Sequence, residues 1–120
     1  MAAAFHICVE TGPYGGAVAQ VEGRSLAAGA AAAANDIVLL GSDLAACHFR
    51  VEQLRRPFRR LRVEALDGPV LVNGRTCLVP GQWTVTPSPL RLRAGSQSFA
   101  ISLPGWRGRL AGVMARLARI

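Results

Sequence analysis

Residues 60–74 read RLRVEALDGPVLVNG and decide the fold class. Residues 60–65 alternate charged and apolar side chains, and this period of two is typical of a β-strand with one buried face. The turn formers Asp67-Gly68-Pro69 follow, and then a second short apolar run over residues 70–72. Asn73-Gly74 closes the stretch and favours a tight hairpin, because both residues tolerate a positive φ. The stretch therefore predicts two short strands in succession.

The same alternation continues on both sides of this stretch. Further short strands are predicted over residues 5–10, 17–22, 26–34 (a strand followed by a loop), 36–40, 47–52, 75–79, 83–85, 90–93 and 98–103. A turn signal separates them about every 8–12 residues, which predicts an all-β sandwich of about ten to eleven short strands. We expect the strand at 36–40 to be buried, and Cys47, Phe49 and Val51 to share the core face of the strand at 47–52.

The composition agrees with a single globular domain. The chain has 120 residues, of which 51% are hydrophobic, and this fraction is too high for a disordered segment. No window of about eighteen uncharged apolar residues is present, so no segment is expected to span a membrane.

The three cysteines, Cys8, Cys47 and Cys77, are an odd number without zinc-binding spacing. We interpret them as small reduced core residues, which places the chain in a reducing compartment.

The residues that could carry out chemistry do not form a catalytic pattern. The seven acidic residues are scattered singly, which gives acid–base glycosidase chemistry no support. Cys47 and His48 are adjacent, so in a strand their side chains point to opposite faces and cannot form a nucleophile–base pair. No metalloprotease, esterase or nucleotide-binding motif occurs. We expect no enzyme activity, no metal and no cofactor.

The chain is strongly basic, with a net charge of +7 and no lysine, a composition that we attribute mainly to coding bias. Its densest run, residues 55–62, reads RRPFRRLR, and Phe58 is the only candidate there for base stacking. Phosphate neutralisation by these arginines would favour a nucleic acid. Pro57 indicates a loop, however, and the later arginines alternate as outward strand positions. We therefore prefer a solvated hairpin that docks on an acidic protein surface, and we expect no nucleic-acid partner.

Residues 104–120 differ from the rest of the chain. Pro104-Gly105 ends the β pattern, and Trp106 and the later apolar residues fall on one face of a helical wheel. The basic residues that flank this face are Arg107, Arg109, Arg116 and Arg119. Such a segment fits a membrane surface, the cytoplasmic flank of a transmembrane helix, or a terminal helix packed on the sandwich. We expect a β-sandwich domain over residues 1–103, a basic juxtamembrane tail over 104–120, and a transmembrane helix after Ile120.

The order of features from Leu26 to Leu103 resembles that of forkhead-associated (FHA) domains. The matching segments are, in chain order, Gly29-Ala30, Asn35 to Leu39, Ala45 to His48, Asp67-Gly68, Val70 to Arg75, Pro80-Gly81 and Phe99 to Ile101. The resemblance covers about two thirds of the chain. It implies an FHA-like β-sandwich, whose loops recognise phosphothreonine in the binding members of the family.

The same resemblance implies that the phosphate-binding groups are missing. The phosphate-binding arginine of the family falls on Ala30, its serine on Ala45, and its peptide-binding asparagine on Asp67. Phosphate recognition needs charge-assisted and hydroxyl hydrogen bonds, and a carboxylate repels a phosphate dianion. Arg24 lies too far before Asp36 to replace the arginine. The positions that build the scaffold are retained, namely Gly29, Asp36, His48, Gly68, Asn73 and Gly74.

A sandwich with these losses ahead of a basic tail is similar to the cytoplasmic domain of the SctD (YscD/HrpQ-type) family, the inner-membrane ring proteins of bacterial type III secretion systems. The resemblance implies a non-catalytic docking domain on the cytoplasmic face of the bacterial inner membrane, in a single-pass protein that associates with itself into a ring. Its expected partners are cytoplasmic sorting-platform or adaptor proteins, together with the membrane through the segment that follows. The alternative is a phosphothreonine-binding signalling adaptor that uses other residues, such as Arg24 or Arg75.

Overall fold

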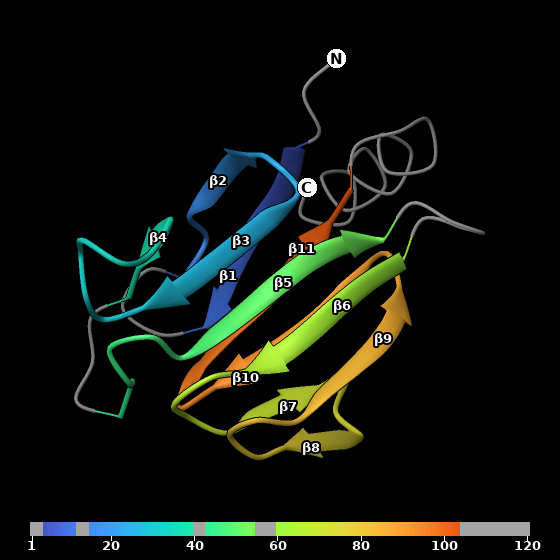
Figure 1. Ribbon diagram of the computed structural model, residues 1–120. Helices are drawn as coiled ribbons and strands as arrows, with labels where there is room; N and C mark the ends of the chain where they lie inside the picture. Colours follow the sequence, from blue (N-terminus) through green and yellow to red (C-terminus); the bar gives the residue numbers. More distant parts are fainter. Residues whose placement is uncertain (1–3, 12–14, 40–42, 55–59, 104–120) are drawn as a thin grey trace.

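The computed structural model describes residues 4–11, 15–39, 43–54 and 60–103, and these residues form eleven strands and no helix (Figure 1). The first six strands are β1 (Ala4–Thr11), β2 (Val18–Glu22), β3 (Ser25–Gly29), β4 (Ile37–Val38), β5 (Phe49–Leu54) and β6 (Arg60–Ala65). The other five are β7 (Val70–Val72), β8 (Thr76–Leu78), β9 (Trp83–Pro87), β10 (Leu90–Ala94) and β11 (Gln97–Ser102). The expected all-β class is confirmed.

The strands form two sheets that pack face to face (Figure 1). The described part of the larger sheet has six strands in the order β2-β1-β11-β10-β7-β8, and that of the smaller has five in the order β4-β3-β5-β6-β9. Neighbouring strands run antiparallel, apart from the parallel pair β3 and β4. This arrangement is the predicted FHA-like β-sandwich.

The core lies between the sheets, because apolar residues alternate along the strands with the predicted period. Leu61, Val63 and Ala65 of β6 are fully buried, and the charged residues between them point outward. Phe49 of β5 packs across the two layers on Phe99 of β11, with 5.9 Å between the ring centres. This aromatic contact joins one sheet to the other.

The loops and turns gather at two opposite ends of the sandwich. At one end, β3, β6 and β10 finish and β5, β7 and β11 begin. We name it the loop end, and its described segments are residues 15–17, 30–36, 43–48, 66–69, 79–82 and 95–96. At the other end, β1 begins and β11 finishes, so both ends of the described chain lie there. We name this the terminal end, and it also holds the turns at residues 23–24 and 73–75.

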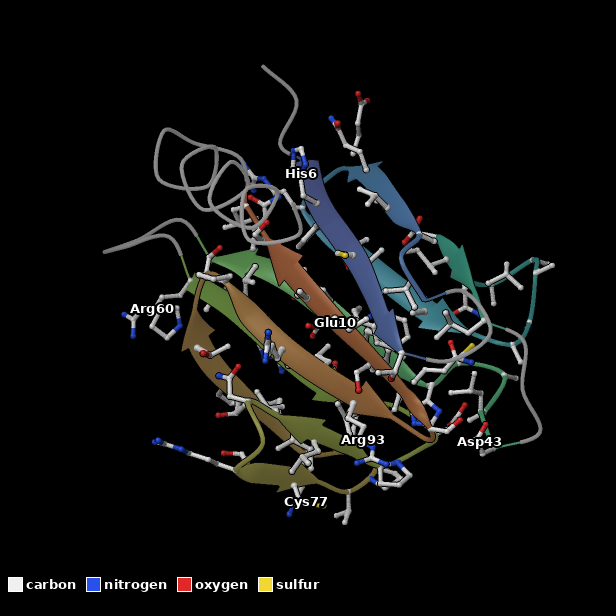
Figure 2. All side chains as sticks on the ribbon, turned by 180° about the vertical axis from the view of Figure 1, so that it is seen from behind. His6, Glu10, Asp43, Arg60, Cys77 and Arg93 are labelled. Carbon is white, nitrogen blue, oxygen red and sulfur yellow. The ribbon has the colours of Figure 1, made fainter. Side chains whose placement is uncertain are left out.

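The prediction that the cysteines belong to the core is wrong. Cys77 is exposed on β8, as Figure 2 shows, and Cys8 and Cys47 are half-buried. Cys8 and Cys77 take the outward positions of their strands, because the buried residues beside them take the inward ones. Cys47 precedes the strand that was expected to contain it, since β5 begins at Phe49. It therefore does not share the core face of that strand.

The predicted buried strand at residues 36–40 is also wrong in its extent and burial. β4 covers only Ile37–Val38 and has β3 as its one neighbour within the described sheet. Val38 is exposed and Ile37 is half-buried, whereas Leu39, which follows the strand, is buried. A strand at the edge of a sheet is covered on one side only, so its apolar residues are less buried than the sequence suggested.

Two predicted segments lie outside the described residues. One is the basic tail with Trp106, Arg107, Arg109, Arg116 and Arg119, and the other is the run at 55–59, which contains Phe58. Within the residues that the structure describes, no helix is long and apolar enough to cross a membrane.

The aromatic contact between the sheets gives a first prediction. Phe49 is only 2% exposed, so we expect Phe49→Ala to lower the free energy of unfolding by about 3–5 kcal/mol, through lost transfer energy and a residual cavity. Denaturant unfolding measures this loss. Val18→Ala is the matched control, because Val18 is 70% exposed, and its cost is expected to stay within about 0.5 kcal/mol. A loss below about 1 kcal/mol for Phe49→Ala would contradict the placement of Phe49 in the core.

Candidate functional site

The imidazole of His48 holds two loops of the loop end together. Its Nδ1 accepts a hydrogen bond from the backbone N–H of Ala45 at 3.1 Å, and its Nε2 lies 2.8 Å from the carbonyl oxygen of Pro69. Because Nδ1 accepts, the ring proton must sit on Nε2 and be donated to Pro69, which assigns the neutral tautomer. His48 is only 2% exposed, and both of its ring nitrogens are satisfied by backbone groups.

Two glycines allow the backbone to approach this centre closely. A Cβ atom on Gly68 would overlap the imidazole ring of His48, and one on Gly29 would overlap the carbonyl oxygen of Ala46. Any larger residue at either position would push a loop away. The two glycines and His48 thus form one packed unit at the loop end.

Backbone hydrogen bonds connect the three loops that carry the predicted site residues. The N–H of Ala30 donates to the carbonyl of Ala45 at 2.9 Å, and the N–H of Asp67 donates to the carbonyl of Cys47 at 3.0 Å. The structure therefore places Ala30, Ala45 and Asp67 on adjacent loops. At these positions it presents two half-buried methyl groups and one exposed carboxylate.

Asn35 is a loop residue whose role the sequence analysis missed. Its side-chain amide donates to the carbonyls of Ala31 and Ala46, each at 2.7 Å, and so joins the loop after β3 to the loop before β5. The signal was available in the pair Asn35-Asp36 after an alanine run, because Asn and Asp side chains often hydrogen-bond nearby backbone groups in turns. Asp36 does so through its Oδ2, which accepts the N–H of Ala27 at 2.8 Å.

Asp43 is a second residue that the sequence analysis missed. Its Oδ2 accepts the backbone N–H of Ser96 at 2.7 Å and ties the segment before β5 to the β10–β11 turn (Figure 2). The Ser96 backbone N–H, with a further contribution from its side chain, lowers the pKa of the Asp43 carboxyl below the usual value of 3.8, because it favours the charged form. This contact had no local signal, since 53 positions separate the two residues.

Asn73 and Gly74 lie at the terminal end, apart from the other predicted scaffold residues. Both have positive φ, +53° and +69°, as the predicted hairpin turn requires. The Asn73 side chain donates to Oγ1 of Thr86 at 3.0 Å and accepts the N–H of Arg91 at 2.9 Å. It thereby fastens the β7–β8 hairpin to β9 and β10.

The aspartates of the chain lie at the opposite end of the sandwich from Arg24 and Arg75. Asp36, Asp43 and Asp67, which are all the aspartates of the chain, lie at the loop end and are exposed. Arg24 and Arg75 lie in turns of the terminal end. The carbonyl of Arg24 accepts the N–H of Gln53 at 2.8 Å. Because Gln53 lies about 17 Å along an extended strand from His48, the backbone of Arg24 is far from the imidazole.

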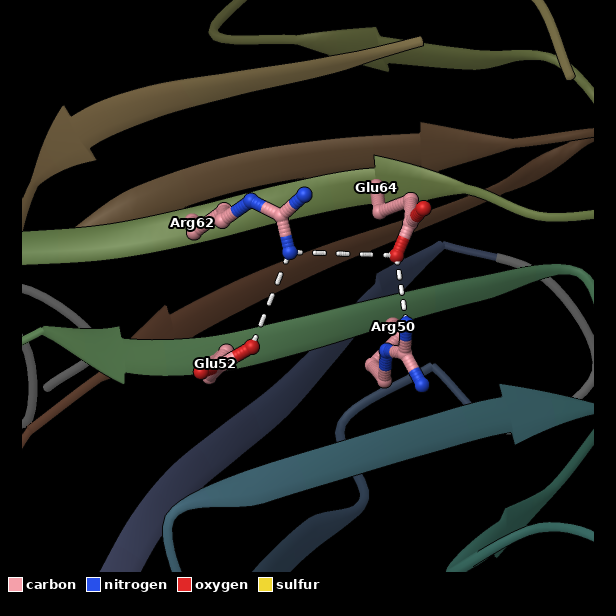
Figure 3. Close-up of polar contacts among 4 residues, drawn as sticks. All are labelled: Arg50, Glu52, Arg62 and Glu64. Atoms are coloured by element: carbon pink, nitrogen blue, oxygen red, sulfur yellow. Dashed lines mark hydrogen bonds and ion pairs between the residues drawn. The ribbon is translucent and has the colours of Figure 1, made fainter. Parts of the chain in front are cut away.

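A network of ion pairs covers the outer face of the five-stranded sheet (Figure 3). Glu64 lies 2.6 Å from Arg50, and Arg62 lies 3.7 Å from Glu52 and 4.0 Å from Glu64. The guanidinium of Arg62 also lies 4.6 Å from the centre of the Trp83 ring, a cation–π contact. These arginines of β5 and β6 already face carboxylates, so they are poorly placed to neutralise the phosphates of a nucleic acid.

The described residues do not assemble catalytic or metal-binding chemistry. Both nitrogens of His48 are engaged by Ala45 and Pro69, so neither can serve Cys47 as a base. Within the part of the chain that is described, no group of three His, Cys, Asp or Glu side chains could hold a metal ion. What the loop end offers is a rigid, carboxylate-bearing surface.

The role of His48 can be tested by truncation. We expect His48→Ala to lower the free energy of unfolding by about 2–4 kcal/mol, because it opens a cavity at a buried position and removes the hydrogen bonds to Ala45 and Pro69. His6→Ala on β1 is the control, because the His6 side chain is exposed, and denaturant unfolding compares the two variants. Equal, small losses would show that the loop end does not depend on the imidazole.

The Asp43 contact predicts a pH-dependent contribution to stability. The pKa of this carboxyl is lowered on folding, so its stabilisation is complete above about pH 3.8 and is lost as the pH falls through the pKa of the folded state. The difference in unfolding free energy between the native chain and Asp43→Asn is therefore expected to shrink with acidification. Chemical denaturation from about pH 6 down to about pH 2 measures it. A difference that is constant with pH would rule this contribution out.

Comparison with known proteins identifies the fold. No protein-family model matches the chain, and no curated protein matches it. Among solved structures, the FHA domain of CT664 from Chlamydia trachomatis has a TM-score of 0.67 at 19% identity, covering 82% of this chain and 96% of that one. The N-terminal FHA domain of S. cerevisiae Rad53p, solved with a phosphothreonine peptide, has a TM-score of 0.69 at 13% identity, covering 83% and 93%. The FhaA FHA domain, complexed with the intracellular domain of Rv3910, has a TM-score of 0.60 at 14% identity, covering 81% and 98%. The chain has the fold of a forkhead-associated domain.

Proposed function

We propose that this chain is a protein-docking module that works without recognising phosphothreonine. The observation that carries the proposal is the composition of the loop end. Its three loops are fully assembled around His48, yet Ala30, Ala45 and Asp67 stand where the resembled family has its arginine, serine and asparagine. The scaffold of a peptide-binding site is present, and the groups that would bind a phosphate are not.

The backbone N–H groups at the substituted positions do not compensate for the missing side chains. A phosphate dianion is bound by charged or hydroxyl donors, or by free backbone N–H groups. The N–H groups of Ala30, Ala31 and Asp67 all donate to carbonyls of the neighbouring loop, at 2.9–3.0 Å. The exposed carboxylate of Asp67 adds repulsion. A phosphorylated side chain would therefore lose its hydration at this surface without gaining equivalent hydrogen bonds.

The secretion-system role extends this proposal. FHA domains bind partner proteins, as the FhaA domain does with the intracellular domain of Rv3910. We place this chain in the inner-membrane ring of a type III secretion system, on the cytoplasmic face, where it recruits sorting-platform or adaptor proteins. The support is the resemblance of the sandwich and its basic tail to the SctD family. Many copies held in a ring would turn a weak single contact into stable recruitment.

The alternative of a phosphothreonine adaptor that uses Arg24 or Arg75 has less support. Both arginines lie at the terminal end, whereas the peptide-binding loops of the resembled family correspond to the loop end of this chain. The geometry therefore favours docking without phosphate.

Titration with phosphothreonine peptide libraries tests the proposal. We expect the native chain to show no phosphate-dependent affinity in the micromolar range, and the variant Ala30→Arg/Ala45→Ser/Asp67→Asn to gain some, because it restores the donors and removes the repulsive charge. Fluorescence polarisation with each peptide and its unphosphorylated form gives the comparison. Micromolar, phosphate-dependent binding by the native chain would overturn the proposal in favour of the signalling adaptor.

A further inference from the structure

We infer that the free edge of β9 is a docking site for an extended, acidic segment of a partner protein, which adds as a strand beside Trp83–Val85. The inference rests on the proposed function, since it names the surface through which the docking module meets its partner. It comes from four observations on the described residues: an ordered aromatic side chain, an open groove, an unpaired backbone edge and the local charge.

Trp83 is a preorganised aromatic anchor. Its side chain is 54% exposed. A large apolar side chain that is left uncovered in this way is typical of a contact site. Arg62 lies against the ring at 4.6 Å, and Glu52 and Glu64 hold Arg62 in turn. The network of Figure 3 thus restricts the tryptophan before any partner arrives, which lowers the entropy cost of binding.

A groove lies beside this tryptophan, where the edges of the two sheets meet. It runs between β8 and the first residues of β9, has a volume of about 480 Å³, and is lined by Cys77, Leu78, Gln82 and Trp83 among others. Val79, in the turn between the two strands, is also exposed. No carboxylate lines the groove, so an apolar side chain from a partner could enter it beside Trp83.

The backbone of β9 has N–H and C=O groups that are not paired within the described sheet. The N–H of Ala65 donates to the carbonyl of Gln82, so Gln82 faces β6. Because the direction of these groups alternates along an antiparallel strand, Thr84 and Thr86 also face β6, and Trp83 and Val85 turn their N–H and C=O groups away from it. β6 is the only neighbour of β9 in the described sheet. Pro87 has no N–H, so an added strand pairs only with the stretch before it.

The charge around this edge favours an acidic partner. Arg75 is exposed directly before Thr76, which lines the groove, and it has no carboxylate partner among the described residues. Arg62 beside Trp83 is already paired with Glu52 and Glu64, so the attraction comes from Arg75. With a net charge of +7 on the whole chain, glutamate or aspartate side chains of the added strand would be attracted to this edge.

The test uses a synthetic peptide of alternating glutamate and valine, with the same peptide carrying lysine in place of glutamate as a control. We expect the glutamate peptide to shift the backbone amide resonances of Trp83 and Val85 in the nitrogen-15-labelled chain, with an affinity in the micromolar range. Trp83→Ala should weaken this binding at least about tenfold. Val85→Pro should abolish it without unfolding the chain, because the N–H that it removes points away from β6.

Val18→Pro is the matched control, because Val18 lies on β2, an edge strand of the six-stranded sheet, and its N–H also points away from its neighbour β1. It should leave binding unchanged. Shifts confined to other strands, equal binding of the lysine peptide, or dimerisation of the chain through β9 would each overturn the inference. Phosphothreonine binding at the loop end would overturn the proposed function instead, and it would leave the peptide result at β9 unchanged.

Discussion

The hydrogen bonds of one buried imidazole hold the loops of the loop end in place. His48 connects the N–H of Ala45 to the carbonyl of Pro69, and Gly68 packs directly on its ring. A buried polar network of this kind specifies one arrangement, because any other leaves its members unpaired. The loops are therefore held in shape by their own contacts, which involve the backbone of Ala30 and Ala45 and do not depend on their side chains.

The sequence predicted the strands well and the loops poorly, for a physical reason. Strand burial follows a period of two, so Leu61, Val63 and Ala65 could be placed in the core from the sequence alone. Loop contacts depend on which distant segments meet, and the bond from Ser96 to Asp43 has no local pattern. The prediction that Cys77 is buried was wrong for a related reason. The sequence of a short edge strand between two turns does not show which of its faces is covered.

A fold that hosts phosphopeptide recognition can keep its scaffold and move its function elsewhere. At the loop end of this chain, the backbone N–H groups of Ala30, Ala31 and Asp67 donate to carbonyls of neighbouring loops. On the side of the sandwich, Trp83 stays exposed within an ordered network of charges. Rigid, partly apolar surfaces of this kind are typical of protein contacts. The proposed docking role would therefore use the sheet edge at β9 rather than the loop end.

The position of the aspartates affects how the domain meets a charged surface. Asp36, Asp43 and Asp67 are exposed at the loop end, where Arg93 of β10 offsets only part of their charge, and Arg24 lies at the terminal end. In the field of an anionic surface the three carboxylates are repelled, which favours orientations that keep the loop end away from that surface. Added salt would weaken this preference.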